Sequence, residues 1–167
     1  GKYPVYISGL LFYAGSRYWT ASILPVLAGT ALPFWLRPSG FSFRLIEGIE
    51  FLIAALFFQS GFSFLLTSAK NEIISSWPGP RLVKHGCIFI VIALLLGFHL
   101  NDNLILQPGV PGYIFIVYGV AAFFVGALYT LRPFCFFRRV GGEIVISVGF
   151  GMIPLLGAYL IQAGDIT

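Results

Sequence analysis

Five apolar stretches, each close to the length that crosses a lipid bilayer, constrain the fold of this chain more than any other feature of its sequence. They lie at residues 18–36, 45–66, 86–100, 113–131 and 144–162. The third is the shortest, since a spanning helix needs about 20 apolar residues. Helices suit the bilayer because they satisfy their backbone hydrogen bonds internally. The sequence therefore predicts an all-α fold, a polytopic transmembrane helical bundle of about five spans.

Strings rich in proline and glycine separate these stretches and predict the loops between them. They read RPSG at 37–40, WPGP at 77–80, QPGVPG at 107–112 and RRVGG at 138–142. Residues 4–14 are too short to span and rich in Tyr and Phe, so we expect them to lie in the membrane interface. We find no repeat, soluble domain or signal peptide, and residues 1–167 are expected to form one transmembrane domain.

Composition supports an integral membrane protein. Hydrophobic residues make up 58% of the chain and charged residues only 10%, against about 25% charged in soluble domains. The net charge of +4 fits the positive-inside rule, so nucleic acid is not expected as a partner. Nothing in the spacing of Cys87 and Cys135 pairs them, and both are expected to be free thiols.

The distribution of Lys and Arg predicts the orientation in the membrane. Eight lie in the N-terminal segment and in the second and fourth loops, namely Lys2, Arg17, Lys70, Arg81, Lys84, Arg132, Arg138 and Arg139. The other side holds only Arg37 and Arg44. We therefore expect a cytoplasmic N-terminus and, with an odd number of spans, a C-terminus on the opposite side of an inner, cytoplasmic-type membrane.

Small residues at four-residue spacing predict close helix packing. They are Ala21, Pro25 and Gly29 in the first stretch, Ala122, Gly126 and Thr130 in the fourth, and Ser147 and Gly151 in the fifth. Pro25 and Pro154 are expected to kink their helices. Kinked helices can line a cavity, and they can equally serve packing alone.

Several strings together resemble the UbiA superfamily of intramembrane prenyltransferases, nearest its dihydroxynaphthoate (menaquinone-pathway) branch. They are SRYWTASILPVLAGTAL at 16–32, ALFFQSG at 55–61, GPRLVKHG at 79–86, YTLRPF at 129–134 and GGEIVISVGFG at 141–151, followed by GAYLIQAG at 157–164. The resemblance extends over the whole chain, which is similar to the N-terminal half of such an enzyme. Family members usually have nine helices and two aspartate-rich motifs that hold Mg²⁺ on a prenyl diphosphate.

The first of these motifs is replaced in this chain. In the stretch FQSGFSFLLTSAKNE at 58–72, Leu66, Thr67 and Lys70 stand where the resemblance implies Asn, Asp and Asp. Magnesium prefers carboxylate oxygens, and on the predicted cytoplasmic side only Glu72 and Glu143 remain as possible remnants of a metal site. Glu143 could equally be a solvated partner of the nearby arginines.

Two further groups are candidate site residues. Lys70, Arg81, Lys84, Arg132, Arg138 and Arg139 could form a cationic rim that binds a diphosphate or a lipid head group, or could merely orient the helices. His85 and His99 lie about 21 Å apart on one helix at 1.5 Å per residue, so they cannot share a metal. Either could ligate a pigment metal, or hydrogen-bond at the interface instead.

These observations favour a catalytically degenerate, UbiA-like accessory subunit of a larger membrane complex, photosynthetic or respiratory. Such a protein would contact lipid and other membrane subunits and could bind an isoprenoid, a quinone, a carotenoid or a chlorophyll-type pigment. The alternative is an active aromatic prenyltransferase that uses Mg²⁺ and has its missing half elsewhere. A small transporter is disfavoured, because the spans contain almost no ionisable residues.

Overall fold

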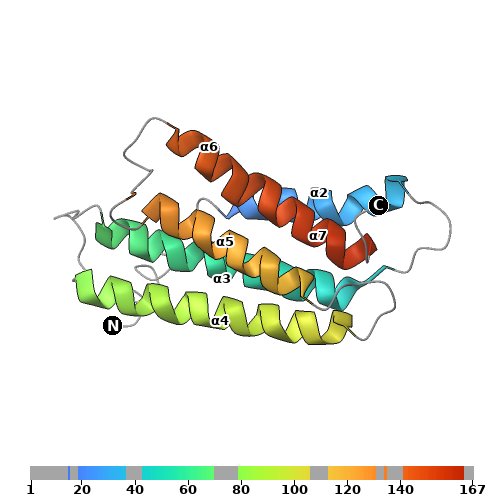
Figure 1. Ribbon diagram of the computed structural model, residues 1–167, viewed down its shortest axis with the longest axis horizontal. Coiled ribbons are helices and arrows are strands. Elements are labelled where there is room, and N and C mark those ends of the chain that lie inside the picture. The colour runs from blue at the N-terminus through green and yellow to red at the C-terminus, as the bar shows by residue number, and fades with distance from the viewer. Residues whose placement is uncertain are drawn as a thin grey trace, which may run out of the picture.

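Every regular element in the described part of the chain is a helix, which confirms the predicted all-α class (Figure 1). The computed structural model describes residues 15, 19–36, 43–69, 79–105, 113–130, 134 and 141–163. The predicted interfacial segment 4–14 lies outside them. The elements are α2 (Thr20–Leu36), α3 (Leu45–Ala69), α4 (Gly79–Ile105), α5 (Ile114–Thr130), α6 (Gly142–Ser147), η3 (Val148–Met152) and α7 (Ile153–Ala163).

Two helix pairings organise the bundle, an antiparallel one between α3 and α4 and a parallel one between α2 and α7 (Figure 1). α3 packs most extensively along α4, and α2 packs along α7. Figure 1 shows α3, α4 and α5 side by side, with the α6–η3–α7 segment and α2 beside them and running roughly along the same axis. The starts of α4 and α6 and the ends of α3 and α5 all lie toward one end of the bundle, as an alternating path through a bilayer requires.

The third helix is longer than the sequence indicated. We predicted residues 86–100, whereas α4 begins at Gly79 and ends at Ile105. The WPGP string was interpreted as a loop, but its last proline, Pro80, lies in the first turn of α4. Proline is tolerated there because the backbone N–H groups of a first turn have no hydrogen-bond partner within the helix. The second helix likewise continues past the predicted end at residue 66 to Ala69.

The last helical segment contains a π-helical turn immediately before Pro154. The Ile153 N–H donates to the carbonyl of Val148, five residues earlier, rather than four. Pro154 cannot donate a backbone hydrogen bond, and its ring would crowd the carbonyl four residues before it. The wider turn therefore lies where the helix has to accommodate the proline.

Apolar residues lie on both the inside and the outside of the bundle. A buried cluster joins four helices through Val26, Phe51, Leu100 and Ile161, with Ala158 and Leu160. Large apolar side chains also face outward, among them Trp35 (90% exposed), Ile46 (78%) and Ile144 (69%). Among the described residues, three helical segments are long and apolar enough to cross a membrane, residues 45–69, 79–103 and 142–163. This surface is compatible with a lipid bilayer as its solvent, and the chain is a membrane protein.

Candidate functional site

A cavity of about 520 Å³, partly open to the outside of the bundle, lies between α3, α4, α5 and the α6–η3–α7 segment. Aromatic and aliphatic side chains form most of its wall. Phe58 and Phe62 contact edge to face with ring centroids 4.9 Å apart, and Phe62 meets Phe123 at 6.1 Å. This volume is within the range of about 300–1,000 Å³ that is typical of small-molecule sites.

Two glycines give the cavity much of its width. A methyl group placed on Gly97 of α4 or on Gly119 of α5 would meet nothing within 4 Å. Both residues line the cavity. By contrast, a methyl group on Gly126 would lie 2.6 Å from the ring of Phe62, so that glycine provides close packing of α5 against α3. Sequence patterning indicated Gly126 but gave no sign of the open space at the other two glycines.

The polar groups in the cavity wall bond mainly to the protein itself. Ser22 donates to the Gln59 carbonyl oxygen at 2.6 Å. The Tyr118 hydroxyl donates to the backbone carbonyl of Ile153, and the Thr130 hydroxyl to that of Gly126 at 2.8 Å. Because these hydroxyl hydrogens are directed into the protein, the cavity offers an occupant a mainly apolar environment.

The positions that would carry the first aspartate-rich motif lie in the last turns of α3. The Leu66 side chain contains no oxygen, and the Thr67 hydroxyl donates to the Ser63 carbonyl of its own helix at 2.9 Å. Lys70 lies outside the described residues. One neutral hydroxyl does not supply the carboxylate oxygens that Mg²⁺ requires, so these residues do not fit the metal that the family resemblance implies.

The other predicted anion and metal residues are only partly described. Arg81 and Lys84 are exposed in the first turns of α4, and Glu143 is exposed in the first turn of α6. Lys70, Glu72, Arg132, Arg138 and Arg139 lie outside the described residues, so the cationic rim and the Glu72–Glu143 pair stay predictions. Across the described ranges, no group of three or more His, Cys, Asp or Glu is placed to hold a metal ion.

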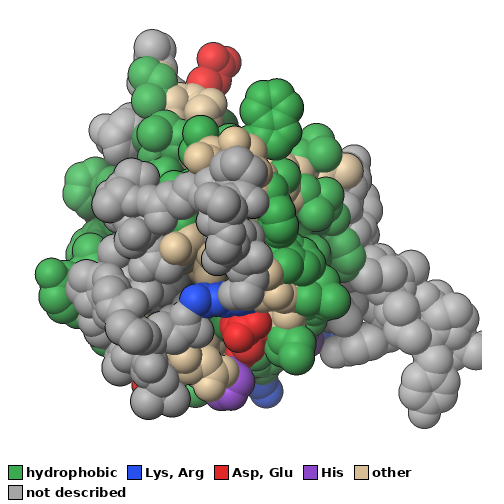
Figure 2. All heavy atoms as spheres, turned by 90° about the vertical axis from the view of Figure 1, so that its right-hand side faces the viewer, with side chains coloured by type: hydrophobic (Ala, Val, Ile, Leu, Met, Phe, Trp, Pro, Cys, Tyr) green, Lys and Arg blue, Asp and Glu red, His purple; other side chains and the backbone are tan. Residues whose placement is uncertain are grey.

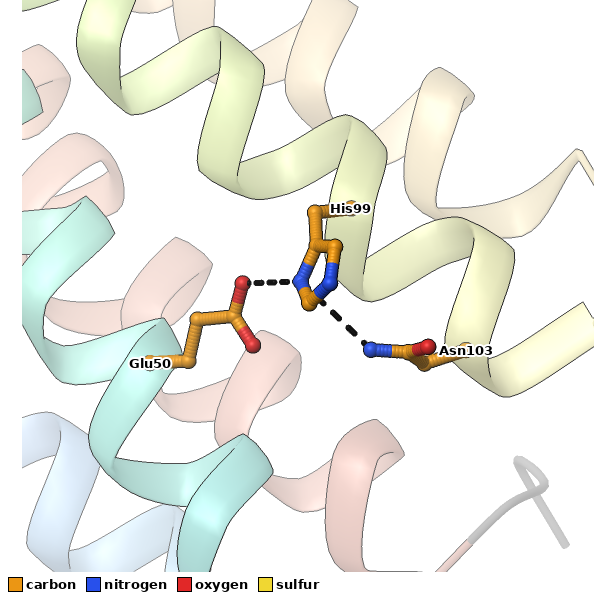
Figure 3. Close-up of polar contacts among 3 residues, drawn as sticks. All are labelled: Glu50, His99 and Asn103. Carbon is orange, nitrogen blue, oxygen red and sulfur yellow. Dashed lines mark hydrogen bonds and ion pairs between the residues drawn. The ribbon is translucent and has the colours of Figure 1, made fainter.

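The two histidines lie near opposite ends of α4, as predicted, and have different surroundings. His85 Nδ1 lies 2.7 Å from the backbone carbonyl of Arg81, one turn earlier in the same helix. His99 Nδ1 lies 2.6 Å from Glu50 Oε1 on α3 (Figure 3). The Glu50 side chain is 14% exposed and the His99 side chain 65%. Asn103 Nδ2 approaches the same ring nitrogen at 3.4 Å.

Sequence analysis missed Glu50 as the partner of His99. Glu50 lies at the end of α3 that faces away from the predicted cytoplasmic side, where the diphosphate site was expected. The antiparallel pairing of α3 and α4 could have indicated this contact. Glu50 lies near the start of α3 and His99 near the end of α4, and these two ends lie side by side in an antiparallel pair. Figure 2 shows basic, acidic and histidine side chains close together at this end of the bundle, among hydrophobic ones.

Comparisons of this protein with models of known protein families, with curated proteins and with solved structures found no match.

Proposed function

We propose that this membrane protein holds an isoprenoid chain, such as the tail of a quinone or carotenoid, inside its bundle without catalysing prenyl transfer. The observation that carries the proposal is the 520 Å³ cavity with its almost wholly apolar wall. A flexible hydrocarbon chain matches such a wall because it needs no hydrogen-bond partners.

The proposal treats the protein as a degenerate relative of the UbiA prenyltransferases. It is supported by Leu66 and by the helix-bound hydroxyl of Thr67 at the positions where that resemblance implies metal ligands. An allylic diphosphate leaves only when its developing charge is neutralised. The alternative is an active prenyltransferase. In that case the protein would form a magnesium-dependent product from a labelled prenyl diphosphate and an aromatic acceptor.

We further propose that the protein is an accessory subunit of a larger membrane complex, with its N-terminus in the cytoplasm. Large aromatic side chains on the outside, such as Trp35 and Tyr113 at 90% and 66% exposed, offer packing surface for other subunits as well as for lipid. A single monodisperse monomer recovered from gently solubilised native membranes would contradict the subunit assignment.

Filling the cavity tests the binding function. We expect Gly119→Leu and Gly97→Leu to lower the amount of isoprenoid that copurifies with the protein, and to weaken binding of a short-chain quinone probe at least tenfold. The Cβ of either new side chain would have nothing within 4 Å, so the substitution starts from a position without a backbone clash. Mass spectrometry of organic extracts and a quinone titration in detergent measure the two effects.

Gly151→Leu is the matched control. Gly151 is also a helical glycine with nothing within 4 Å of an added methyl group, but it does not line the cavity. It should retain the isoprenoid. Equal loss in all three variants, or no bound isoprenoid in the parent protein, would contradict the proposed function.

A further inference from the structure

We propose that His99 is the axial ligand of a metal tetrapyrrole that binds on the outer surface of the α3–α4 pair. His99 does not line the cavity, so this site is separate from the proposed isoprenoid site and does not depend on it. Four observations about the His99 ring and its neighbours carry the inference.

The first observation is the ring's hydrogen bonding. Glu50 Oε1 is an acceptor at 2.6 Å from Nδ1, so the proton belongs on Nδ1, which donates to the carboxylate. The 3.4 Å approach of the Asn103 amide to the same nitrogen is then a contact and not a hydrogen bond. Nε2 is left with its lone pair and with no partner among the described residues (Figure 3).

The second observation is that the partner is a carboxylate. Metal-binding histidines usually donate their second N–H to a carboxylate or carbonyl, which fixes the ring orientation and makes the other nitrogen a better ligand. His85 receives a weaker form of this arrangement, from the neutral carbonyl of Arg81 in its own helix. Glu50 instead reaches His99 from a second helix, so the orientation of the ring depends on the fold.

The third observation is that, among the described residues, His99 would be the only nitrogen or sulfur ligand. Within the described ranges no third metal-binding side chain joins Glu50 and His99, and Glu50 already accepts from the imidazole. A bare divalent ion would need three or four protein ligands. A metal that arrives with four macrocycle nitrogens needs only one, and magnesium chlorins, zinc porphyrins and haem all meet that condition.

The fourth observation is the surface around the ring. The His99 side chain is 65% exposed, so a bulky ligand can reach it. Leu95 lies one helical turn before it and is 62% exposed, and Ile46 and Ile53 lie about one turn on either side of Glu50 at 78% and 42% exposed. These aliphatic side chains provide apolar contact for a flat macrocycle at the membrane surface of the bundle.

Zinc protoporphyrin is a suitable probe because zinc in that ring accepts a single axial ligand. We expect the full chain in detergent micelles to bind one equivalent and to shift the main porphyrin absorption band to longer wavelength. His99→Ala should abolish the shift, and His85→Ala should leave it unchanged. The circular dichroism spectrum of His99→Ala should match that of the parent protein, which shows that the variant is folded.

Glu50→Gln tests the positioning role of the carboxylate. The amide oxygen still accepts from Nδ1, so the ring keeps its orientation, but the charge is lost. We expect the affinity for the porphyrin to fall by about 10–100-fold. An unshifted band with the parent protein, or the same shifted band with His99→Ala, would overturn the assignment. Retention of the shift in Gly119→Leu separates this site from the cavity.

Discussion

Single side chains tie the helices together through hydrogen bonds in apolar surroundings. At one end of the bundle, Gln162 of α7 accepts from the Arg44 backbone N–H at 3.1 Å and donates to the Arg44 carbonyl at 2.9 Å. Further along α3, Trp19 donates to Ser60 at 3.1 Å and Ser22 donates to Gln59. Gln162 thereby satisfies a backbone N–H at the start of α3 that the helix itself leaves free. Water does not compete for these bonds, because Gln162 is only 2% exposed.

Gln162→Met should therefore destabilise the bundle. The substitution keeps the length of the side chain but removes both hydrogen bonds to Arg44, and we expect the free energy of unfolding to fall by about 1–2 kcal/mol. Thermal or denaturant unfolding in mild detergent, followed by circular dichroism, measures the change. Thr30→Val is the control, because that hydroxyl bonds only to the Val26 carbonyl within its own helix. Equal stability of the Gln162→Met variant and the parent would contradict the assigned role.

At the scale of helices, glycines set how closely neighbouring elements approach. A methyl group on Gly29 of α2 would lie 2.1 Å from the Leu155 carbonyl oxygen of the α7 backbone, and one on Gly157 of α7 would lie 2.4 Å from the Phe51 ring. The small-residue pattern predicted the first contact and missed the second. The predicted close packing at Ser147 and Gly151 was wrong, since Ser147 is exposed and a methyl group on Gly151 would have nothing within 4 Å. A four-residue spacing indicates a possible contact face but does not say whether another helix lies against it.

Gly29→Leu tests the α2–α7 contact. The new side chain would clash with backbone, which cannot rotate away as a flexible side chain could, so the two helices must separate. We expect a loss of about 1–3 kcal/mol in stability, measured by the same unfolding experiment. The neighbouring Ala28 is exposed, and Ala28→Leu should be tolerated. If both variants unfold alike, the close approach of α2 and α7 is not what limits stability.

At the scale of the whole molecule, the sequence was sufficient to predict where the helices lie, but not to predict the cavity between them. Length and hydropathy located the described helices, because the bilayer sets both. They did not reveal the cavity or the Glu50–His99 pair. Apolar residues surround each helix on the lipid side and on the core side alike, so no amphipathic pattern marks the inner face. Gly97 and Gly119 line the cavity only because of how α4 and α5 lie relative to each other.

The orientation of the whole bundle is the remaining prediction that charge alone supports. Because Lys and Arg concentrate in the N-terminal segment and in the second and fourth loops, the start of α6 should face the cytoplasm and the end of α4 the opposite side. Two exposed residues mark these ends, Glu143 in the first turn of α6 and Asn103 near the end of α4. Each can be changed to Cys after Cys87 and Cys135 are replaced by Ser.

In sealed right-side-out vesicles, a membrane-impermeant maleimide should then label Asn103→Cys directly. Glu143→Cys should react only after the vesicles are permeabilised, because its thiol would face the lumen. Inside-out vesicles should give the opposite order, which controls for any difference in thiol reactivity between the two positions. Direct labelling of Glu143→Cys in right-side-out vesicles would show that the bundle is inserted the other way. The Glu50–His99 pair would then lie near the cytoplasmic face, and a tetrapyrrole bound there would have to be supplied from the cytoplasm.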